Sequence, residues 1–303
     1  MTGSHPGLGI ALVLLMGLLF AGMDTAIRHL GGTLPVLLLI TVRYTFQAVL
    51  MAAWLALDRR QRFRPVHLRF QLLRGVLLLL VSAFSFWGLQ VVPVAEFTAI
   101  LLLTPVLVTL LAALVLKEEV SPLRWALVAC AFAGAIIVIR PGGGVLGWGV
   151  LYPLGGTLTY AFFQLLTRRL AGVESPYTTH FWTGLTGAAI LLPLLLLAPL
   201  DLGAVWSVAS AAQVGLLLLI GALGTSGHLL LILAYGLAPP AVLMPFVYVQ
   251  IGSAALLGWL AFRQAPDAWG WVGMAVIGAS GAASVWLNSR QSPLRFADSA
   301  VAD

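Results

Sequence analysis

Residues 8–30 read LGIALVLLMGLLFAGMDTAIRHL, an almost unbroken apolar stretch. The hydrocarbon core of a bilayer is roughly 30 Å thick, so a helix needs about 20 mainly apolar residues to cross it. This stretch is long enough, and it continues past the length of a typical secretion signal to the ionisable Asp24. We therefore expect residues 8–30 to form a first membrane-spanning helix.

The same pattern recurs along the whole chain. Of 303 residues, 61% are hydrophobic and 9% are charged, and the mean hydropathy is +1.03, which no water-soluble fold could bury. The sequence therefore predicts an all-α integral membrane protein with short connections and no soluble domain. Apolar runs between polar, Pro and Gly breaks predict ten helices, at residues 8–30, 35–57, 71–92, 94–116, 122–140, 146–170, 177–199, 213–237, 239–262 and 268–288.

Basic residues are unevenly distributed over the predicted connections. Three of them, Arg28, Arg140 and Arg263, lie on the side away from the termini. Twelve lie on the side of the termini: Arg59, Arg60, Arg62, Arg64, Arg69, Arg74, Lys117, Arg124, Arg168, Arg169, Arg290 and Arg295. Cytoplasmic loops carry an excess of Lys and Arg, so both termini are expected in the cytoplasm of a bacterium, with the chain in its inner membrane. This bias also accounts for the net charge of +6, and no nucleic-acid partner is expected.

The two halves resemble each other at an offset of 146 residues (239 minus 93), at which Pro93 aligns with Pro239 and Trp125 with Trp271. A repeat of five helices is odd-numbered, so the second copy enters the membrane in the opposite orientation, an inverted repeat typical of carriers. We assign the first repeat to residues 1–142, the second to 143–290, and a short cytoplasmic tail to 291–303. Chance similarity among apolar helices is the alternative.

Motifs in the first half resemble a known family. Residues 104–107 (TPVL) lead to residues 117–121 (KEEVS), and the next helix ends with residues 139–142 (IRPG). This pattern resembles the repeat of the EamA family in the drug/metabolite transporter superfamily, and the likeness covers essentially the whole chain. Within that superfamily the chain most resembles bacterial exporters of aromatic and other amino acids. The second half departs from the pattern, since Ile251 stands opposite Pro105 and Gln264 opposite Glu118.

The resemblance implies two inverted halves around a central cavity, with the fifth and tenth helices at the periphery. It also implies a secondary transporter that exports amino acids by alternating access. Riboflavin, S-adenosylmethionine, nucleoside-like metabolites and drugs are alternative substrates. The expected partners are therefore a small molecule and the lipid bilayer, and the chain is expected to be a monomer or a weak homodimer.

Ionisable residues inside predicted helices are candidates for the substrate site, because a charge within a bilayer costs several kcal/mol. Asp24 and Arg43 lie roughly 9 and 12 Å from the same ends of helices one and two, at 1.5 Å per residue. They could contact the two charges of a zwitterion. Alternatively, they pair with each other, or Asp24 pairs with Arg28 four residues along its own helix.

Polar and aromatic residues of the later helices complete the predicted cavity. Tyr160 and Gln164, one helical turn apart, are the strongest pair, and His228 either relays protons or bridges helices through a hydrogen bond. Pro105 and Pro245 fall inside predicted helices, where they are either hinges or static kinks. The further cavity candidates are Trp87, Tyr248 and Gln250.

Two other classes of function are less well supported. The sequences GTSG (224–227) and GASG (278–281) match a GxSG pattern of intramembrane serine proteases, but no histidine follows His228 to serve as the base. We therefore expect no enzyme activity. No ligand cluster for a metal and no phosphate-binding loop are present in the sequence, so no metal and no cofactor are expected. A channel is the remaining alternative function, although an inverted repeat favours a carrier.

Overall fold

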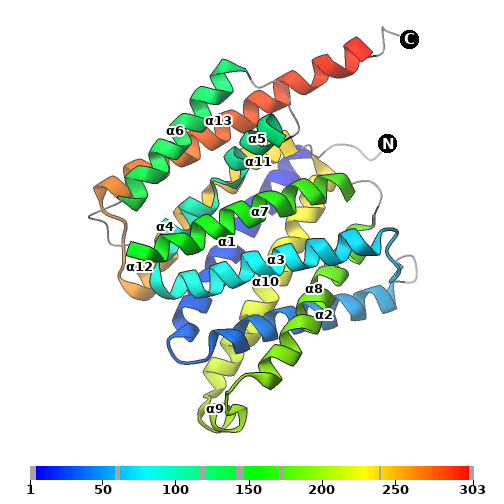
Figure 1. Ribbon diagram of the computed structural model, residues 1–303, viewed down its shortest axis with the longest axis vertical. Helices are drawn as coiled ribbons and strands as arrows, with labels where there is room; N and C mark the ends of the chain where they lie inside the picture. The colour runs from blue at the N-terminus through cyan, green and yellow to red at the C-terminus, as the bar shows by residue number, and fades with distance from the viewer. Residues whose placement is uncertain are drawn as a thin grey trace.

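The computed structural model describes residues 5–58, 62–115, 121–140, 147–170, 174–238 and 240–299. This part of the chain is a bundle of helices without a β-strand (Figure 1). The elements are α1 (Pro6–Gly31), α2 (Val36–Leu57), α3 (Leu68–Val91), α4 (Val94–Leu101), α5 (Thr104–Val115), α6 (Pro122–Ile139), the 3-10 turn η1 (Gly147–Val150), α7 (Leu151–Leu170), α8 (Pro176–Leu197), α9 (Leu202–Val208), α10 (Ala211–Leu237), α11 (Pro240–Val247), α12 (Val249–Phe262) and α13 (Ala268–Ser299).

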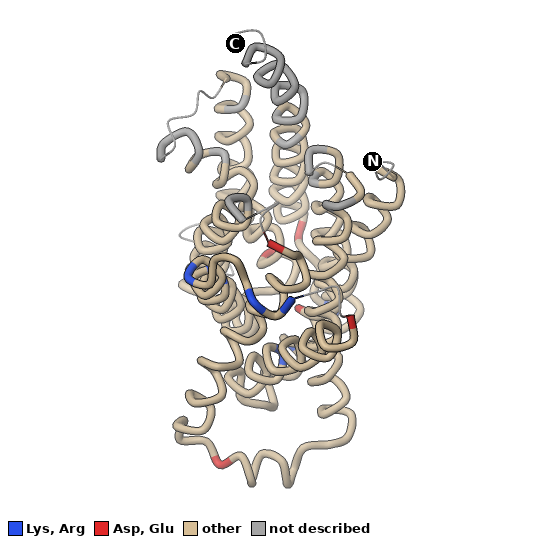
Figure 2. The backbone as a smooth tube through the Cα atoms, turned by 90° about the vertical axis from the view of Figure 1, so that its right-hand side faces the viewer, with Lys and Arg blue, Asp and Glu red and all other residues tan. Residues whose placement is uncertain are grey.

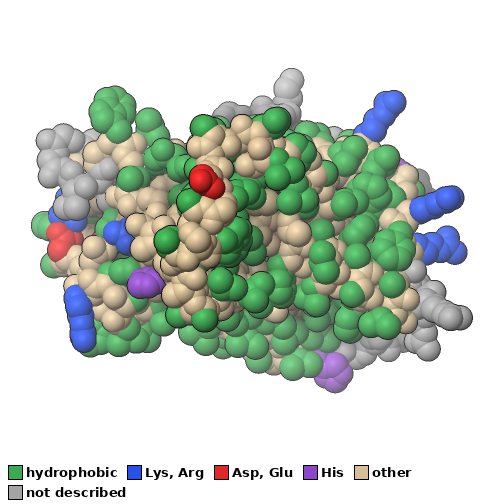
Figure 3. All heavy atoms as spheres, turned by 90° about the horizontal axis from the view of Figure 1, so that it is seen from below, with side chains coloured by type: hydrophobic (Ala, Val, Ile, Leu, Met, Phe, Trp, Pro, Cys, Tyr) green, Lys and Arg blue, Asp and Glu red, His purple; other side chains and the backbone are tan. Residues whose placement is uncertain are grey.

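Six stretches of the described chain are long and apolar enough to cross a bilayer on their own. They are Pro6–Gly31, Val36–Leu57, Leu68–Val91, Pro176–Leu197, Ala211–Ala234 and Pro245–Phe262. Charged positions are sparse along these helices (Figure 2). In the space-filling view the middle of the surface is largely hydrophobic, and most Lys and Arg side chains lie toward its two ends (Figure 3). A multi-pass membrane protein is the arrangement that this surface fits.

The predicted helix 94–116 is broken in the structure. Leu102 and Leu103 form a turn between α4 and α5, and Pro105 is the second residue of α5 rather than a mid-helix residue, as the sequence analysis had expected. Proline is well tolerated there, because the first turn of a helix needs no N–H donor. The Thr104 hydroxyl donates to the Leu101 carbonyl at 2.6 Å, the acceptor that Pro105 cannot reach for lack of an N–H.

The predicted helix 239–262 is broken as well. Pro245 lies inside the short helix α11, which ends at Val247, and Tyr248 separates it from α12. A proline inside a helix removes one hydrogen bond of the ladder and bends the axis. Both prolines therefore lie within three residues of a break in a helix.

The remaining differences concern helix ends. Helix α13 continues to Ser299, beyond the predicted end at residue 288 and into the predicted tail 291–303, and α9 was not predicted. Several predicted features lie outside the described residues: Arg59, Arg60, Lys117, the motif positions 118–120, residues 141–142, and the proposed boundary after residue 142.

Helix α1 lies at the centre of the bundle, in contact with α2, α3, α4, α10, α11 and α12, whereas α6 and α13 pack against each other along one edge (Figure 1). Two glycines allow that pair to approach closely. A Cβ atom on Gly273 would lie 2.7 Å from the Gly134 carbonyl oxygen, and one on Gly134 would lie 2.9 Å from the Gly273 carbonyl oxygen. Between helices in lipid the hydrophobic effect gives no driving force, so close van der Waals packing through small residues stabilises such a crossing.

Polar contacts join the helices at the end of the bundle where α6 stops and α13 begins. Arg140 and Asp267 form a bidentate ion pair with distances of 2.6 and 2.7 Å. Hydrogen bonding to Arg140 lowers the pKa of Asp267, and the same bond raises the pKa of Arg140. Arg28 donates to the carbonyl oxygens of Leu89 and Val92 and to Gln264 Oε1, so it does not pair with Asp24.

We expect Gly273→Ala to lower the free energy of unfolding by about 1–3 kcal/mol, because its methyl group would overlap the backbone of α6. Thermal unfolding in detergent measures this as a lower midpoint. Gly252→Ala in α12 is the matched control, since nothing lies within 4 Å of its added Cβ. Equal midpoints for the two variants would contradict the close packing of α6 on α13.

Candidate functional site

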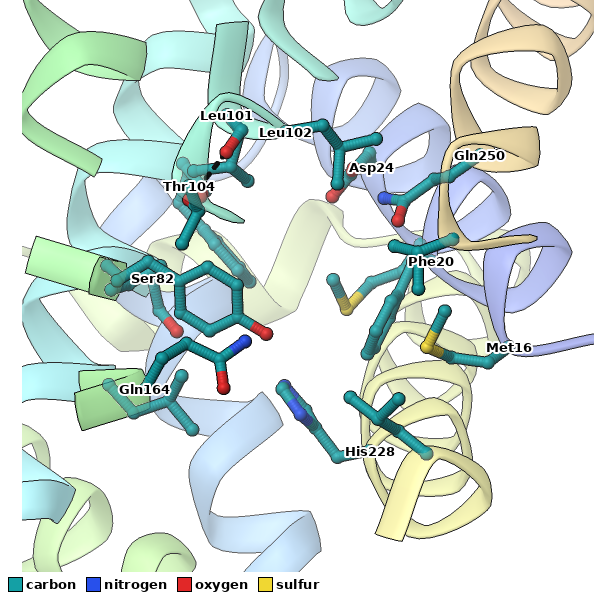
Figure 4. Close-up of a pocket in the computed structure, with 18 of the residues that line it drawn as sticks. Met16, Phe20, Asp24, Ser82, Leu101, Leu102, Thr104, Gln164, His228 and Gln250 are labelled. Atoms are coloured by element: carbon teal, nitrogen blue, oxygen red, sulfur yellow. Dashed lines mark hydrogen bonds between the residues drawn. The ribbon is translucent and has the colours of Figure 1, made fainter. Parts of the chain in front are cut away.

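A cavity lies in the middle of the bundle, between α1, α10 and α12 on one side and α3, α5 and α7 on the other (Figure 4). Its empty volume is about 870 Å³, which includes space open to solvent. The lining residues are Met16, Phe20, Met23, Asp24, Arg43, Leu78, Val81, Ser82, Ser85, Phe86, Leu101, Leu102, Thr104, Pro105, Tyr160, Gln164, His228, Leu231, Val247 and Gln250. We call this set the central cavity.

Six of the eight residues predicted to form the site lie around the central cavity, although they come from both halves of the chain. These are Asp24, Arg43, Tyr160, Gln164, His228 and Gln250. Asp24 and Gln250 are seen on one side and Gln164 on the other (Figure 4). The geometry therefore makes them available to one ligand. Their role in binding remains a prediction.

Trp87 and Tyr248 do not line the central cavity. Ser82, Ser85 and Phe86 occupy the cavity face of α3, and Trp87 follows about 100° further around the helix, with 39% of its surface exposed. Tyr248 lies in the break between α11 and α12 and packs onto Gly281 of α13. The first residue faces outward and the second faces a neighbouring helix, so neither fits the predicted position.

Arg43 is held toward the cavity by its neighbours on α2 and α3. Its Nη1 donates to Ser82 Oγ at 3.1 Å, and its guanidinium carbon lies 4.6 Å from the centre of the Tyr44 ring. The Tyr44 hydroxyl forms a hydrogen bond of 2.9 Å with the same Ser82 oxygen. Only 2% of Arg43 is exposed, so this network of neutral groups fixes a buried cation at the wall of the cavity.

Asp24 is also buried, on the opposite helix α1. The one ion pair with both partners in the described chain joins Arg140 and Asp267, so the predicted contact of Asp24 with Arg43 does not form. Arg28, the other predicted partner, contacts the end of α3 instead. The acidic Asp24 and the basic Arg43 thus line one cavity without direct contact.

His228 lines the cavity beside Phe20, with the two rings edge to face at 4.8 Å between centroids. Its other ring neighbour is His180 of α8, at 6.1 Å. Gln47 Nε2 lies 3.2 Å from His180 Nδ1 and donates to the His180 carbonyl at 3.0 Å. The two histidines connect the cavity to a buried polar contact between α2 and α8.

Arg74 is the charged residue that the sequence analysis misplaced. It was counted among the basic residues on the side of the termini, although the predicted helix 71–92 contains it, and in the structure it lies inside α3 and is 5% exposed. Its Nε donates to Thr167 at 2.9 Å and its Nη1 to Thr183 at 2.7 Å. The spacing of Arg74, Leu78 and Ser82, four residues apart each time, was the signal that all three share one face of the helix.

The charged and polar side chains of the cavity suit a ligand with both polar and aromatic parts. Phe20, Phe86 and Tyr160 supply ring surfaces, and Gln164 and Gln250 supply amides that both donate and accept hydrogen bonds. In the described part of the chain, no group of three His, Cys, Asp or Glu side chains could hold a metal ion. The site therefore offers recognition by shape, stacking and hydrogen bonding.

Comparisons with known proteins agree with this arrangement. The model of the EamA-like transporter family matches the chain twice, over residues 7–140 and 147–286. A riboflavin transporter of Vibrio cholerae is 27% identical over 281 residues, which cover 90% of this chain and 91% of that protein.

Two further relatives are similar over shorter stretches. A riboflavin transporter of Rhizobium johnstonii is 34% identical over 194 residues, but the match spans only 63% of this chain and 61% of that relative's length. An S-adenosylmethionine uptake transporter of Rickettsia prowazekii is 20% identical over 80% of this chain and 81% of its own.

We expect Ser82→Ala to destabilise the protein by about 1–3 kcal/mol, since it removes the acceptor of the buried Arg43 donor and the partner of Tyr44. The thermal unfolding midpoint in detergent measures the change. Ser226→Ala, at an exposed serine of α10, is the matched control and should leave the midpoint unchanged. A Ser82 variant as stable as the wild type would show that Arg43 does not depend on this contact.

Proposed function

We propose, from the premise that this chain belongs to the EamA-like transporter family, that it carries riboflavin or a closely similar flavin across the inner membrane of a bacterium. It is a multi-pass membrane transporter of the EamA kind, in the drug/metabolite transporter superfamily, as the resemblance of its sequence indicated. The substrate, the direction of transport and the number of membrane crossings are the parts that we propose.

The relatives favour a flavin over an amino acid. Two of the three named relatives are riboflavin transporters, and one of them is similar over 90% of this chain. The third is an S-adenosylmethionine uptake transporter. Export of amino acids, preferred on sequence alone, has no support among them, and we replace it by riboflavin, with S-adenosylmethionine as the second candidate.

The composition of the central cavity carries the proposal. Riboflavin combines a flat aromatic ring system with an imide edge and a chain of hydroxyl groups. The rings of Phe20, Phe86 and Tyr160 supply apolar faces for the ring system, while Gln164 and Gln250 can donate to carbonyl oxygens and accept from the imide and hydroxyls. A site with both kinds of group binds such a ligand better than either kind alone would.

Helix contacts support two inverted repeats. Let the first five segments (α1, α2, α3, α4 with α5, α6) correspond in order to the last five (α7, α8, α10, α11 with α12, α13). Under this correspondence, the contact of α1 with α10 is equivalent to the contact of α7 with α3. The contact of α2 with α10 is likewise equivalent to the contact of α8 with α3, and all four contacts are present. The pairs α2 with α8 and α6 with α13 map onto themselves. We therefore propose ten crossings, with the repeats at residues 1–142 and 143–290.

The two broken helices occupy corresponding positions in these repeats, and both reach the central cavity. Leu101, Leu102 and Thr104 line it from the first break, and Val247 and Gln250 from the second. Discontinuous helices at a repeat interface are typical of carriers that expose one site alternately to the two sides. We propose that the two halves rock about these breaks, with Pro105 and Pro245 beside the points of bending. A fixed channel has no need of such a pair of breaks.

Orientation follows from the charges. We place both termini in the cytoplasm and the ion pair of Arg140 with Asp267 on the outer side, because basic residues gather on the side of the termini. With its own cavity in each chain, a monomer suffices for transport. The flux then follows the gradient of the substrate, inward or outward.

We expect Tyr160→Ala and Gln164→Ala each to lower the initial rate of riboflavin uptake into proteoliposomes about tenfold at low substrate concentration. Each loses a contact worth about 1–1.5 kcal/mol in the cavity. Trp87→Ala is the matched control and should stay within about twofold, as Trp87 faces away from the cavity. Wild-type protein that is folded yet carries no flavin would refute the proposal, and normal rates in both variants would exclude α7 from the site.

Asp24→Asn separates the two candidate substrates. Riboflavin is neutral, so we expect its rate to change less than about threefold, whereas S-adenosylmethionine carries a sulfonium cation and should lose about tenfold or more with the buried carboxylate. Parallel uptake of both labelled compounds measures this. A larger loss for riboflavin than for S-adenosylmethionine would reverse the order of the candidates.

A further inference from the structure

The buried charges of the described chain do not balance. Apart from histidine, the acidic and basic side chains that are buried in it are Asp24, Arg43 and Arg74, with exposed fractions of 5%, 2% and 5%. None of them belongs to an ion pair with a described residue. Buried charges in proteins are normally paired, because an apolar interior does not replace the water that they lose. The described interior therefore holds two guanidinium groups and one carboxyl group.

The contacts of Arg43 are with neutral groups and leave one of its nitrogens without a partner. Ser82 Oγ accepts one of its hydrogens, and the ring of Tyr44 covers one face. Its Nε is buried and has no hydrogen-bond partner. Gly224 of α10 adjoins this nitrogen, since a Cβ there would lie 3.0 Å from it. Arg43 thus lines the central cavity with no acidic partner, while its unpaired Nε is enclosed against α10.

The contacts of Arg74 are also neutral. The hydroxyl oxygens of Thr167 and Thr183 accept from it, and its guanidinium carbon lies 4.4 Å from the centre of the Phe163 ring. Phe163 in turn stacks on Tyr160 at 5.5 Å, and Tyr160 lines the central cavity. Arg74 is therefore one aromatic layer behind the cavity wall.

The two arginines lie along one side of α3. Ser82, which holds Arg43, is about two helical turns from Arg74, or roughly 12 Å along the helix axis. Gln164 of α7 lies between the residue that lines the cavity, Tyr160, and the residue that binds Arg74, Thr167, on the same helix.

We propose that Arg43 forms an anion site on the α3 side of the central cavity, that Arg74 adds positive potential from behind the Tyr160 and Phe163 rings, and that the site takes a carboxylate or phosphate group. The group belongs either to the carried molecule or to a small inorganic anion bound beside it. Guanidinium groups suit both chemistries, because they donate two parallel hydrogen bonds to such oxygens. The choice of flavins as probes rests on the proposed function; the charge argument does not.

Binding of two flavins to purified protein tests the site. Flavin fluorescence gives the dissociation constants of riboflavin and of its phosphate ester, flavin mononucleotide, in low-salt buffer. We expect the ester to bind about tenfold tighter or more in the wild type. Arg43→Gln should remove most of that preference and Arg74→Gln a smaller part of it, whereas Arg43→Lys should keep part of it. Arg263→Gln, at an exposed arginine outside the cavity, is the control with the same change of charge.

A second measurement separates the sources of the anion and needs no flavin. Thermal unfolding midpoints are followed while phosphate or chloride is added, with Arg263→Gln again as the control. A preference for the ester alone supports an acidic group on the carried molecule. A midpoint that rises with free anion in the wild type but not in Arg43→Gln supports a separate anion.

The anion site would be overturned if the two flavins bind with equal affinity and the thermal unfolding midpoint does not change with added phosphate or chloride. The proposal of riboflavin transport would be unaffected by that result, because it does not depend on the anion site. Conversely, if neither flavin binds but the midpoint rises with anions, the flavin proposal fails and the anion site stands. Because the anion dependence is first measured in the wild type, a variant that fails to fold does not leave the question open.

Discussion

A bilayer offers no water to a backbone amide, and this constraint organises the whole molecule. Each helix must satisfy its own N–H and C=O groups, so irregular backbone is tolerated only where protein or a cavity surrounds it. The turn at Leu102 and Leu103 and the break at Tyr248 obey this rule, since both adjoin the central cavity. At the first break, the Thr104 hydroxyl supplies a hydrogen bond to the Leu101 carbonyl. The same constraint leaves the polar side chains of the cavity as the groups that a ligand can reach.

Much of the helical framework was predictable, because a membrane-spanning helix has a nearly fixed length and an apolar composition. The beginnings and ends of α1, α2, α8 and α10 fall within about two residues of their predicted positions. The break before Pro105 was not predicted, since a proline in sequence does not say whether a helix bends through it or restarts at it. The extension of α13 to Ser299 was missed because the prediction stopped where the apolar pattern ended.

The site was predicted less completely, and the reasons differ from residue to residue. Asp24 and Arg43 were found because a charge in an apolar run is conspicuous, but their separation depends on tertiary packing that no spacing encodes. Trp87 was chosen by its residue type, and the structure places it outside the lining of the central cavity. Arg74 was missed because it lies near the end of its predicted helix and was counted with the basic residues that orient the chain. The apolar lining residues Met16 and Phe20 carry no signal at all in a chain where 61% of the residues are hydrophobic.

Helices α6 and α13 contribute no residue to the central cavity, although they pack closely on one another through Gly134 and Gly273. Their outward side chains meet lipid, and their contact with the rest of the bundle is limited. Adaptation to a thicker, thinner or differently charged bilayer can therefore proceed by substitutions in this pair while the cargo-binding surface stays untouched. In evolutionary terms, contact with the lipid and recognition of the substrate depend on separate helices. Relatives in different membranes can therefore keep the same substrate, and relatives in similar membranes can change it.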